Sequence, residues 1–467
     1  MTQKEKNLEK FDRYVNNCIP FRLIRLSDMS LVSRDGVMKH FRGSVRKEAF
    51  YNPFYHVRYA ILSHRWLQQG EPTYEEMAAG TALGPGYEKL KKFCEKAREC
   101  NLEFAWSDTC CIDKSNGAEL DESIRSMFRW YKNSAICIVH LAQSKTIEDI
   151  VDDEWATRGW TLQELLAPDK IKLFGEDWMP MTDKRNDKSY LKTDAMEMLE
   201  RATGIPHDSI FRFSPGPHKV DTRMTWAARR NTTRAEDVAY SMMGIFNVSM
   251  PTAYGEGGER AFCRLIEVIM QFGDPSVLNW RGDPANHHTS HAIPRSPQNF
   301  VGRPELQLDG VRLEMTMTNL GLRVPLVMFP LNFHSKMEAG NAYTFTLECP
   351  LCTSITLDIN APSQVTASHQ YALGIINYSI FDDGSHEILG IRGKSAGFIL
   401  FRTRDQFYTR GRQKPVVLDT VAPPKHKFGQ WNIAYFFQGG LAEVDFPGIL
   451  RSSMFYMNRK YLKTVYL

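Results

Sequence analysis

Apolar runs and amphipathic stretches alternate along the chain between residues 59 and 174. Residues 59–62 are apolar throughout, and 102–106, 135–141 and 170–174 are further runs that are largely apolar. Such runs indicate strands that are buried on both faces. Between them, residues 86–100, 118–132 and 158–165 have the apolar spacing of helices. The order β, α, β, α, β, α, β predicts a parallel sheet with right-handed crossovers and helices on both sides.

The stretch RGWTLQEL at 158–165 carries an aromatic residue and a carboxylate with helical spacing. Residues four apart lie one above the other on a helix, so Trp160 and Glu164 are expected on one face. Leu162 and Leu165 fall on the neighbouring face, where they can anchor the turn in a core. We therefore expect an indole ring beside an acid.

Polar side chains follow the predicted strands at three points. In a parallel sheet the ligand crevice lies outside the carboxyl ends of the strands. The clusters at 63–66, at 107–113 and in the segment that leads to residue 164 should therefore converge on one site. The candidate residues are Ser63, His64, Arg65, Trp66, Asp108, Arg158, Trp160 and Glu164.

The remaining segments set the expected domains. Residues 1–55 are weakly patterned and are interpreted as an N-terminal extension that can hold a short strand pair. An α/β domain is expected over 56–272. It includes a helix at 232–246, with a Thr cap and with Glu236 and Asp237 in its first turn, and a helix at 259–271. Both are interpreted as packing layers for the sheet.

After residue 272 the pattern changes to short alternating or apolar runs between turn residues. Such runs predict an antiparallel sandwich or barrel over 273–467. No catalytic constellation is evident in this β-rich region, which can serve ligand recognition, regulation or assembly.

Composition restricts the class of protein. The 467 residues are 43% hydrophobic and 24% charged, as expected for a folded protein of two or three domains. The net charge is +4 without a basic cluster, so a nucleic-acid partner is not expected. No apolar run approaches the roughly 18 residues of a membrane span, and the charged N-terminus is unlike a secretory signal. We expect a soluble, cytoplasmic protein.

The nine cysteines are scattered through apolar contexts, as in reduced intracellular proteins. Cys349 and Cys352 form a CxxC pair, but a zinc site needs further ligands at similar spacing, so a structural role is favoured. A metal site built from His64, Asp108 and Glu164 has no supporting spacing, and no metal is expected. Nothing in the sequence orients Cys110 as a nucleophile toward His64.

Several stretches resemble one protein family. YAILSHRW at 59–66, WSDTCCIDKSNGAELDESIRSMFRWY at 106–131 and RGWTLQELLAP at 158–168 resemble the three blocks of the fungal heterokaryon incompatibility (HET) domain. The later stretches MTWAARRNTTRAEDVAYSMMGIF and MPTAYGEGGERAF resemble the same family. The resemblance covers roughly 56–272. It implies a protein of fungal non-self recognition and programmed cell death.

The HET domain is itself similar to the TIR domain, which implies a TIR-like (flavodoxin-like) parallel sheet. Residues 62–65 correspond to the first TIR strand and its polar end, and 104–108 to the second strand with its aspartate. WTLQEL at 160–165 corresponds to the TIR pattern W-C-x-x-E-L, with Thr161 in place of the cysteine. In active TIR domains this glutamate cleaves NAD, so the resemblance implies a catalytic role for Glu164. The loop after residue 108 departs from the TIR pattern.

One carboxylate is chemically sufficient for this reaction. The nicotinamide of NAD is cationic and departs as a neutral molecule, so Glu164 needs only to stabilise the developing positive charge. NAD or NADP would be the substrate, and no cofactor is required. Trp160 can form an apolar wall, and Arg65 or Arg158 can pair with the pyrophosphate.

Structural roles remain open for the same residues. Trp160 can be core, Glu164 can be a solvated helix residue, Ser63 and His64 can form a turn, and Asp108 can be a turn or cap residue. The alternative function is a non-catalytic TIR-like module for self-association or signalling. For either function we expect a homo-oligomer formed through the HET domain.

Overall fold

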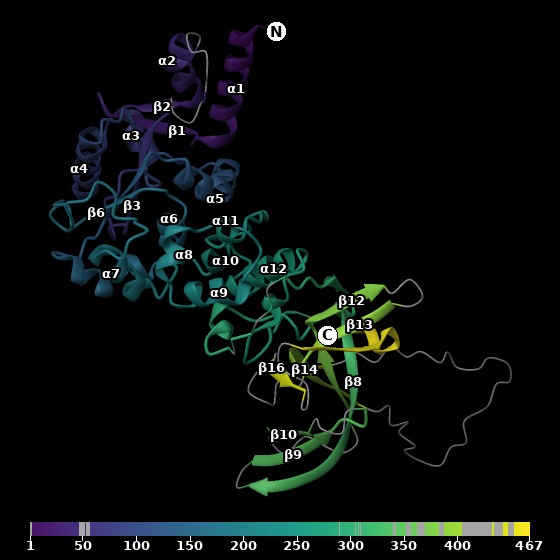
Figure 1. The fold of residues 1–467 in the computed structure, drawn as a ribbon. Coiled ribbons are helices and arrows are strands. Elements are labelled where there is room, and N and C mark those ends of the chain that lie inside the picture. Colours follow the sequence, from purple (N-terminus) through teal and green to yellow (C-terminus); the bar gives the residue numbers. More distant parts are fainter. Residues whose placement is uncertain are drawn as a thin grey trace, which may run out of the picture. The chain divides into compact units, whose positions relative to one another are not determined.

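The chain divides into two compact units, Met1–Gly216 with Arg229–Ala261 and Pro217–Ala228 with Phe262–Leu467. The computed structural model describes residues 2–45, 52, 57–288, 290–303, 305–306, 308, 310–339, 342–351, 356–361, 369–382, 387–403, 432–433, 442–446 and 453–467. Each unit has its own sheet system (Figure 1).

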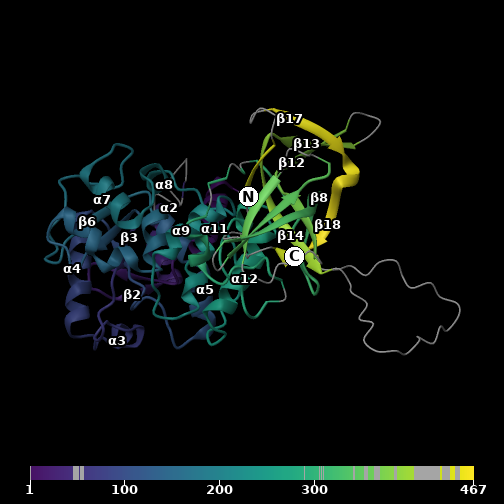
Figure 2. The ribbon, with the colours of Figure 1, turned by 90° about the horizontal axis from the view of Figure 1, so that it is seen from below.

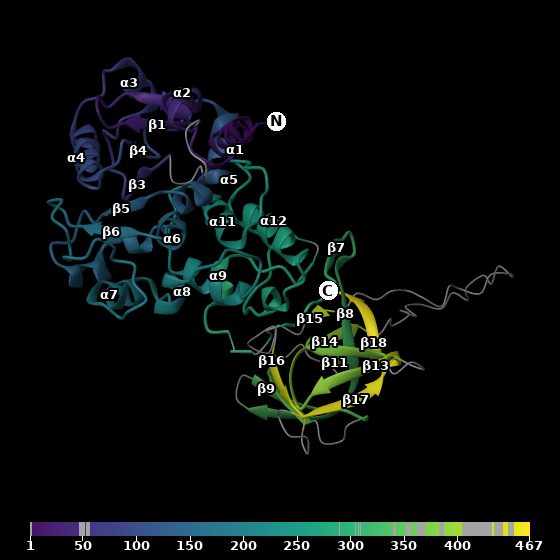
Figure 3. The same ribbon diagram turned by 45° about the horizontal axis from the view of Figure 1, so that its top comes forward.

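A six-stranded sheet forms the centre of the first unit, with the order β2-β1-β4-β3-β5-β6. Figure 3 labels β1, β4, β3, β5 and β6 of this sheet. The strands are β1 (Arg22–Arg25), β2 (Leu31–Ser33), β3 (Tyr59–His64), β4 (Phe104–Trp106), β5 (Ile136–His140) and β6 (Ile171–Phe174). Strands β3 to β6 pair in parallel, and β1 is antiparallel to β2 and β4. The four predicted parallel strands and the N-terminal strand pair are confirmed, and the pair extends the same sheet.

Helices flank this sheet. They are α1 (Gln3–Cys18), α2 (Arg34–Val45), α3 (Tyr74–Ala79), α4 (Pro85–Glu99), α5 (Gly117–Lys132), α6 (Thr161–Leu166), α7 (Asp194–Thr203), α8 (His207–Phe211), α10 (Asp237–Tyr240) and α11 (Met243–Phe246). Two 3₁₀ helices, η2 (Ile147–Asp152) and η3 (Glu154–Thr157), precede α6. The predicted α/β architecture of a parallel sheet with flanking helices is confirmed.

The connections of the parallel strands reverse direction in the middle of the sheet. From β3 the chain moves to β4 on one side, and from β5 it moves to β6 on the other. Such a reversal leaves a crevice at the carboxyl ends of the two central strands, here β3 and β5. Side chains of a strand alternate between the two faces, so Ser63 and His64 at the end of β3 point to opposite sides of the sheet.

The prediction of one helix over 232–246 is wrong. The chain forms the short helices α10 and α11 after an irregular segment. The acids assigned to the first turn make tertiary hydrogen bonds instead, because Glu236 accepts from the backbone N–H groups of Gly255 and Gly257 at 2.8 and 3.0 Å. The next helix forms close to its predicted position, as α12 (Gly258–Met270).

The second unit is rich in antiparallel strands, as predicted. Its strands are β7 (Thr316–Thr318), β8 (Gly321–Ala339), β9 (Ala342–Glu348), β10 (Thr356–Ala361), β11 (His369–Ile375), β12 (Tyr378–Asp382), β13 (Glu387–Arg392), β14 (Lys394–Thr403), β15 (Asn432–Ile433), β16 (Ala442–Asp445), β17 (Met454–Asn458) and β18 (Leu462–Tyr466). They form a nine-stranded and a three-stranded sheet, and the latter joins β12, β13 and β17 (Figure 2).

The helical segments of the second unit include α9 (Val220–Ala228), η4 (Pro275–Leu278), η5 (Pro297–Phe300) and η7 (Arg459–Tyr461). Cys349 is buried, and its predicted CxxC partner Cys352 lies outside the described residues. In the described part of the chain no helix is both long enough and apolar enough to cross a membrane.

Candidate functional site

A cleft of about 540 Å³ lies at the carboxyl ends of the parallel strands, within the first unit. This volume is typical of small-molecule sites. The cleft is lined by His64, Trp66, Asp108, Ile112, Lys114, Leu120, Ile124, Met127, Glu154, Thr157, Arg158, Gly159, Trp160, Glu164, Asn231, Thr232, Thr233, Arg234, Asp237 and Tyr254. Six of the eight predicted site residues are therefore brought together, and Ser63 and Arg65 are not among the lining residues.

Glu164 enters the cleft from α6, a helix of only six residues. A helix this short is not stable by itself, so tertiary contacts must hold it. All six of its residues are buried. At its C-terminal end the ammonium group of Lys188 donates to the carbonyl oxygens of Leu165, Leu166 and Pro168 at 3.0, 3.0 and 2.7 Å.

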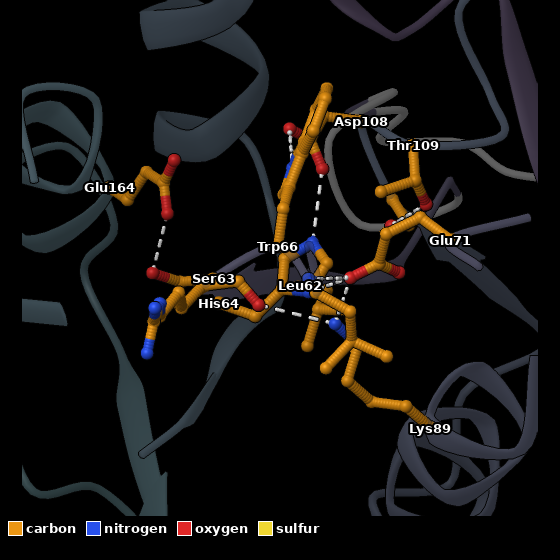
Figure 4. Close-up of polar contacts among 12 residues, drawn as sticks. Leu62, Ser63, His64, Trp66, Glu71, Lys89, Asp108, Thr109 and Glu164 are labelled. Carbon is orange, nitrogen blue, oxygen red and sulfur yellow. Dashed lines mark hydrogen bonds and ion pairs between the residues drawn. The ribbon is translucent and has the colours of Figure 1, made fainter. Parts of the chain in front are cut away.

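The carboxylate of Glu164 is hydrogen bonded to the end of β3 (Figure 4). Ser63 Oγ donates to Glu164 Oε2 at 2.5 Å and accepts from the indole N–H of Trp155 at 2.7 Å. Since the indole can only donate, the Ser63 proton is left for the carboxylate. Ser63 therefore lies behind the cleft and orients Glu164 without lining the cleft itself.

The pKa of Glu164 is raised to about 8. Burial is the largest cause, since the residue is only 6% exposed, and the negative charge of Asp108 adds to it. The hydrogen bonds from Ser63 and Tyr131 and the charge of Arg158 act in the opposite direction. Glu164 is therefore mainly protonated at neutral pH.

His64 and Asp108 form a second polar cluster on the other side of β3 (Figure 4). His64 Nε2 lies 3.2 Å from Asp108 Oδ1, and the indole N–H of Trp66 donates to Asp108 Oδ2 at 2.9 Å. Burial, and then the nearby charge of Lys89, lower the pKa of His64, so its imidazole is neutral at pH 7. The neutral ring can then donate from Nε2 to Asp108.

Asp108 stays ionised although it is buried. Burial by itself would raise its pKa, but the contacts with His64, Lys114 and Trp66 outweigh burial and lower the pKa to about 2. On the far side of His64, the ammonium group of Lys89 contacts Glu71 and donates to the carbonyl oxygen of Arg65 at 3.2 Å.

The two predicted arginines differ in their environment. Arg65 pairs with Glu154, with Nε 2.9 Å from Oε2, and its guanidinium is already neutralised. Arg158 lines the cleft. Its backbone carbonyl accepts from the buried guanidinium of Arg230 at 2.7 Å, and the same nitrogen donates to Thr161 Oγ1 at 2.8 Å.

Trp160 lines the cleft and is held by a residue from a later segment. Its indole N–H donates to Asp237 Oδ2 at 3.0 Å, and the hydroxyl of Tyr254 donates to Asp237 Oδ1 at 2.8 Å. Burial raises the pKa of Asp237, and these two hydrogen bonds oppose the rise. The wall formed by Trp160 is therefore fixed in orientation by Asp237.

The segment 231–237 is the part of the cleft that the sequence interpretation missed, because it was assigned to a packing helix. Backbone hydrogen bonds join it to the Glu164 segment: Gly159 N–H donates to Asn231 O at 2.8 Å, and Asn231 N–H donates to Thr157 O at 2.7 Å. The resemblance of 224–246 to the HET family was the available signal. The apolar wall of the cleft includes Leu120, Ile124 and Met127, which lie within the helix predicted over 118–132.

No metal site accompanies this cleft within the described residues, where no group of three or more His, Cys, Asp or Glu side chains could hold a metal ion. The thiols near β4 are not activated either. Burial raises the pKa of Cys94 to about 12, and the contact with Cys111 and burial raise the pKa of Cys110 well above its usual value. A low pKa is what a cysteine nucleophile needs.

Comparison with known proteins shows similarity over part of the chain. Residues 59–149 match the family model described as heterokaryon incompatibility protein (HET). The chain is also similar to the vegetative incompatibility protein HET-E-1 of Podospora anserina, with 41% identity over 225 residues. This match covers 45% of the chain and 16% of that relative, so the chain spans a small part of its length. No solved structure matches the chain.

Glu164→Gln should change the pH dependence of stability. The folded-state pKa of about 8 lies above the ordinary value of 4.5, so between these pH values the folded wild type binds the extra proton and loses stability as pH rises. Glu164→Gln has no titrating group at this position, so its stability does not fall for this reason as pH rises. Relative to Glu164→Gln, the free energy of unfolding of the wild type should fall by up to about 1.4 kcal/mol per pH unit in this window. Urea unfolding at several pH values measures the difference, and parallel curves would contradict it. Glu95→Gln, at an exposed position, is the control.

Gly159→Ala should separate the two joined segments. A Cβ at this position would lie 2.4 Å from Thr232 Cγ2, so the neighbouring chain must move. We expect a loss of roughly 1 to 3 kcal/mol in the free energy of unfolding. Adding Thr232→Ser removes the clashing methyl group and should recover part of the loss, which a double-mutant cycle measures. Additive effects of the two changes would rule out this contact as the cause.

Proposed function

We propose that residues 56–272 form a heterokaryon incompatibility (HET) domain and that this domain is a NAD(P) glycohydrolase that triggers cell death in non-self recognition or defence. The observation that carries the proposal is the buried carboxylate of Glu164, which lines a cleft at the carboxyl ends of a parallel sheet. The similarity to a vegetative incompatibility protein of Podospora anserina supports the biological role.

The topology supports a TIR-like site. In chain order, the parallel strands lie as second, first, third and fourth across the sheet, which is the order of flavodoxin-like folds. In such folds the ligand binds between the first and third strands, here β3 and β5. Glu164 and Ser63 meet at this point. The sequence around Glu164 resembles the TIR pattern that carries the catalytic glutamate.

The proposed reaction needs one carboxylate and a partly dry cleft. The bond between ribose C1′ and the nicotinamide nitrogen breaks, and its electron pair leaves with the neutral nicotinamide. Ionised Glu164 stabilises the positive charge that develops on the ribose. Water then adds to C1′ as Glu164 accepts its proton. The apolar side chains of Ile124 and Met127 and the ring of Trp160 limit access of water and strengthen these electrostatic effects.

A non-catalytic module for self-association is the second candidate. Exposed apolar side chains in the first unit favour it, since Tyr190 is 66% exposed and Leu191 is 55% exposed. Both candidate functions include homo-oligomerisation through the HET domain. The decisive difference between them is the chemical role of Glu164.

Nicotinamide release should require Glu164. NAD and nicotinamide are measured by mass spectrometry over a wide range of concentrations of the purified protein, for the wild type and for Glu164→Gln. We expect release by the wild type and a loss of at least about 100-fold in the variant, as is typical when an electrostatic catalytic group is removed. Glu95→Gln, on the exposed face of α4, is the matched control and should retain activity. Equal release by Glu164→Gln, or no release from folded wild type, would count against the enzyme.

The pH profile gives an independent test. In the free protein Glu164 must lose its proton, so kcat/KM should rise with pH and level off above about 8. The nicotinamide ring of bound NAD carries a positive charge and favours the ionised carboxylate. The pH profile of kcat should therefore lie at lower pH than that of kcat/KM. Asp108, with its pKa of about 2, stays ionised throughout this range. Activity that falls as the pH rises toward 8 would contradict a carboxylate mechanism.

A further inference from the structure

We infer that Arg158 and Arg234 form a subsite for the pyrophosphate group of a dinucleotide. The inference rests on the proposed function for the identity of the ligand, but binding to the subsite can be measured without cleavage. Both residues line the cleft that contains Glu164. Arg65, which sequence analysis offered as the alternative to Arg158, is paired with Glu154.

The charges of the cleft are unevenly matched. Each of its four carboxylates has a polar partner: Asp108 with His64 and Trp66, Glu154 with Arg65, Glu164 with Ser63, and Asp237 with Trp160 and Tyr254. In contrast, neither the Arg158 nor the Arg234 guanidinium forms an ion pair or a hydrogen bond with any described residue. The charge of Arg158 already lowers the pKa of Glu164, and that of Arg234 lowers the pKa of Asp237, but the N–H groups of both guanidiniums are available to an anion.

The guanidinium of Arg234 lies over an aromatic ring. Its guanidinium carbon lies 4.2 Å from the centroid of the Tyr254 ring. The Tyr254 hydroxyl donates to Asp237, and its ring packs edge-on against Tyr240, with centroids 5.4 Å apart. Stacking engages the flat face of a guanidinium and leaves its N–H edge free. That edge can donate two parallel hydrogen bonds to a phosphate.

Backbone contacts join the two segments that carry the arginines. Arg158 forms a parallel bridge with Asn231, and Gly159 permits the close approach of Thr232. Arg158 is thus bridged to Asn231, a residue only three positions before Arg234 in the sequence. Two guanidinium groups carried by joined segments of one cleft are suited to two linked phosphates. The substrate class that this favours is a dinucleotide, and a nucleoside without phosphate lacks the recognised group.

The test measures binding of ADP-ribose to the folded protein by calorimetry, for the wild type, Arg158→Gln and Arg234→Gln. Each substitution should weaken ADP-ribose binding by roughly 10-fold to 100-fold, the range for a lost charge-assisted contact. Binding of adenosine, which lacks phosphate, should not change. Arg212→Gln is the matched control, because Arg212 also lies over a ring, that of Phe211, but does not line the cleft.

Three results would overturn the inference: unchanged affinity of both variants for ADP-ribose, no binding of ADP-ribose to the wild type, or binding of inorganic phosphate as tight as that of ADP-ribose. The last would assign the subsite to free phosphate. The proposed glycohydrolase can fail separately, since arginine-dependent binding of ADP-ribose without nicotinamide release would retain the subsite and reject the reaction. Nicotinamide release that is independent of both arginines would retain the reaction and reject the subsite.

Discussion

Burial of the Glu164 carboxylate is the constraint on which the rest of the site depends. A buried carboxyl group is costly unless it is protonated or receives hydrogen bonds and opposite charge. Ser63 supplies the hydrogen bond, and the buried guanidinium of Arg230 supplies charge close by. These groups come from the end of β3 and from the segment before α10. The end of β3 and the segment before α10 therefore both contribute groups that stabilise the buried Glu164 carboxyl group.

This arrangement also explains why so short a helix is held so firmly. Arg230 bonds the residues that start α6, and the Lys188 ammonium group bonds the carbonyl oxygens at its end. Burial lowers the pKa of Lys188 to about 7, so this amine is itself only marginally charged at neutral pH. A catalytic group works best when surrounding residues fix its position. The site therefore owes its geometry to tertiary hydrogen bonds and not to the stability of α6.

The sequence predicted what depends on local pattern. The strands β3 to β6 and the helices α4 and α5 follow from apolar periodicity, and the polar residues at the strand ends pointed to the cleft. Local sequence pattern could not predict contacts between distant segments. Asp237 was interpreted as a first-turn residue of a helix, but its carboxylate binds Trp160 and Tyr254. The ion pair of Arg65 with Glu154 and the stacking of Arg234 on Tyr254 likewise depend on the folded chain.

The alternation of side chains along β3 has a chemical consequence. Ser63 directs its hydroxyl to Glu164, and His64 on the other face bonds Asp108. One acid is thereby kept mainly protonated and the other ionised, although both line the same cleft. Environments that push two pKa values apart are how proteins assign different roles to like groups. A ligand cation that enters this cleft would favour loss of the Glu164 proton, so binding itself would generate the charged form that the proposed reaction requires.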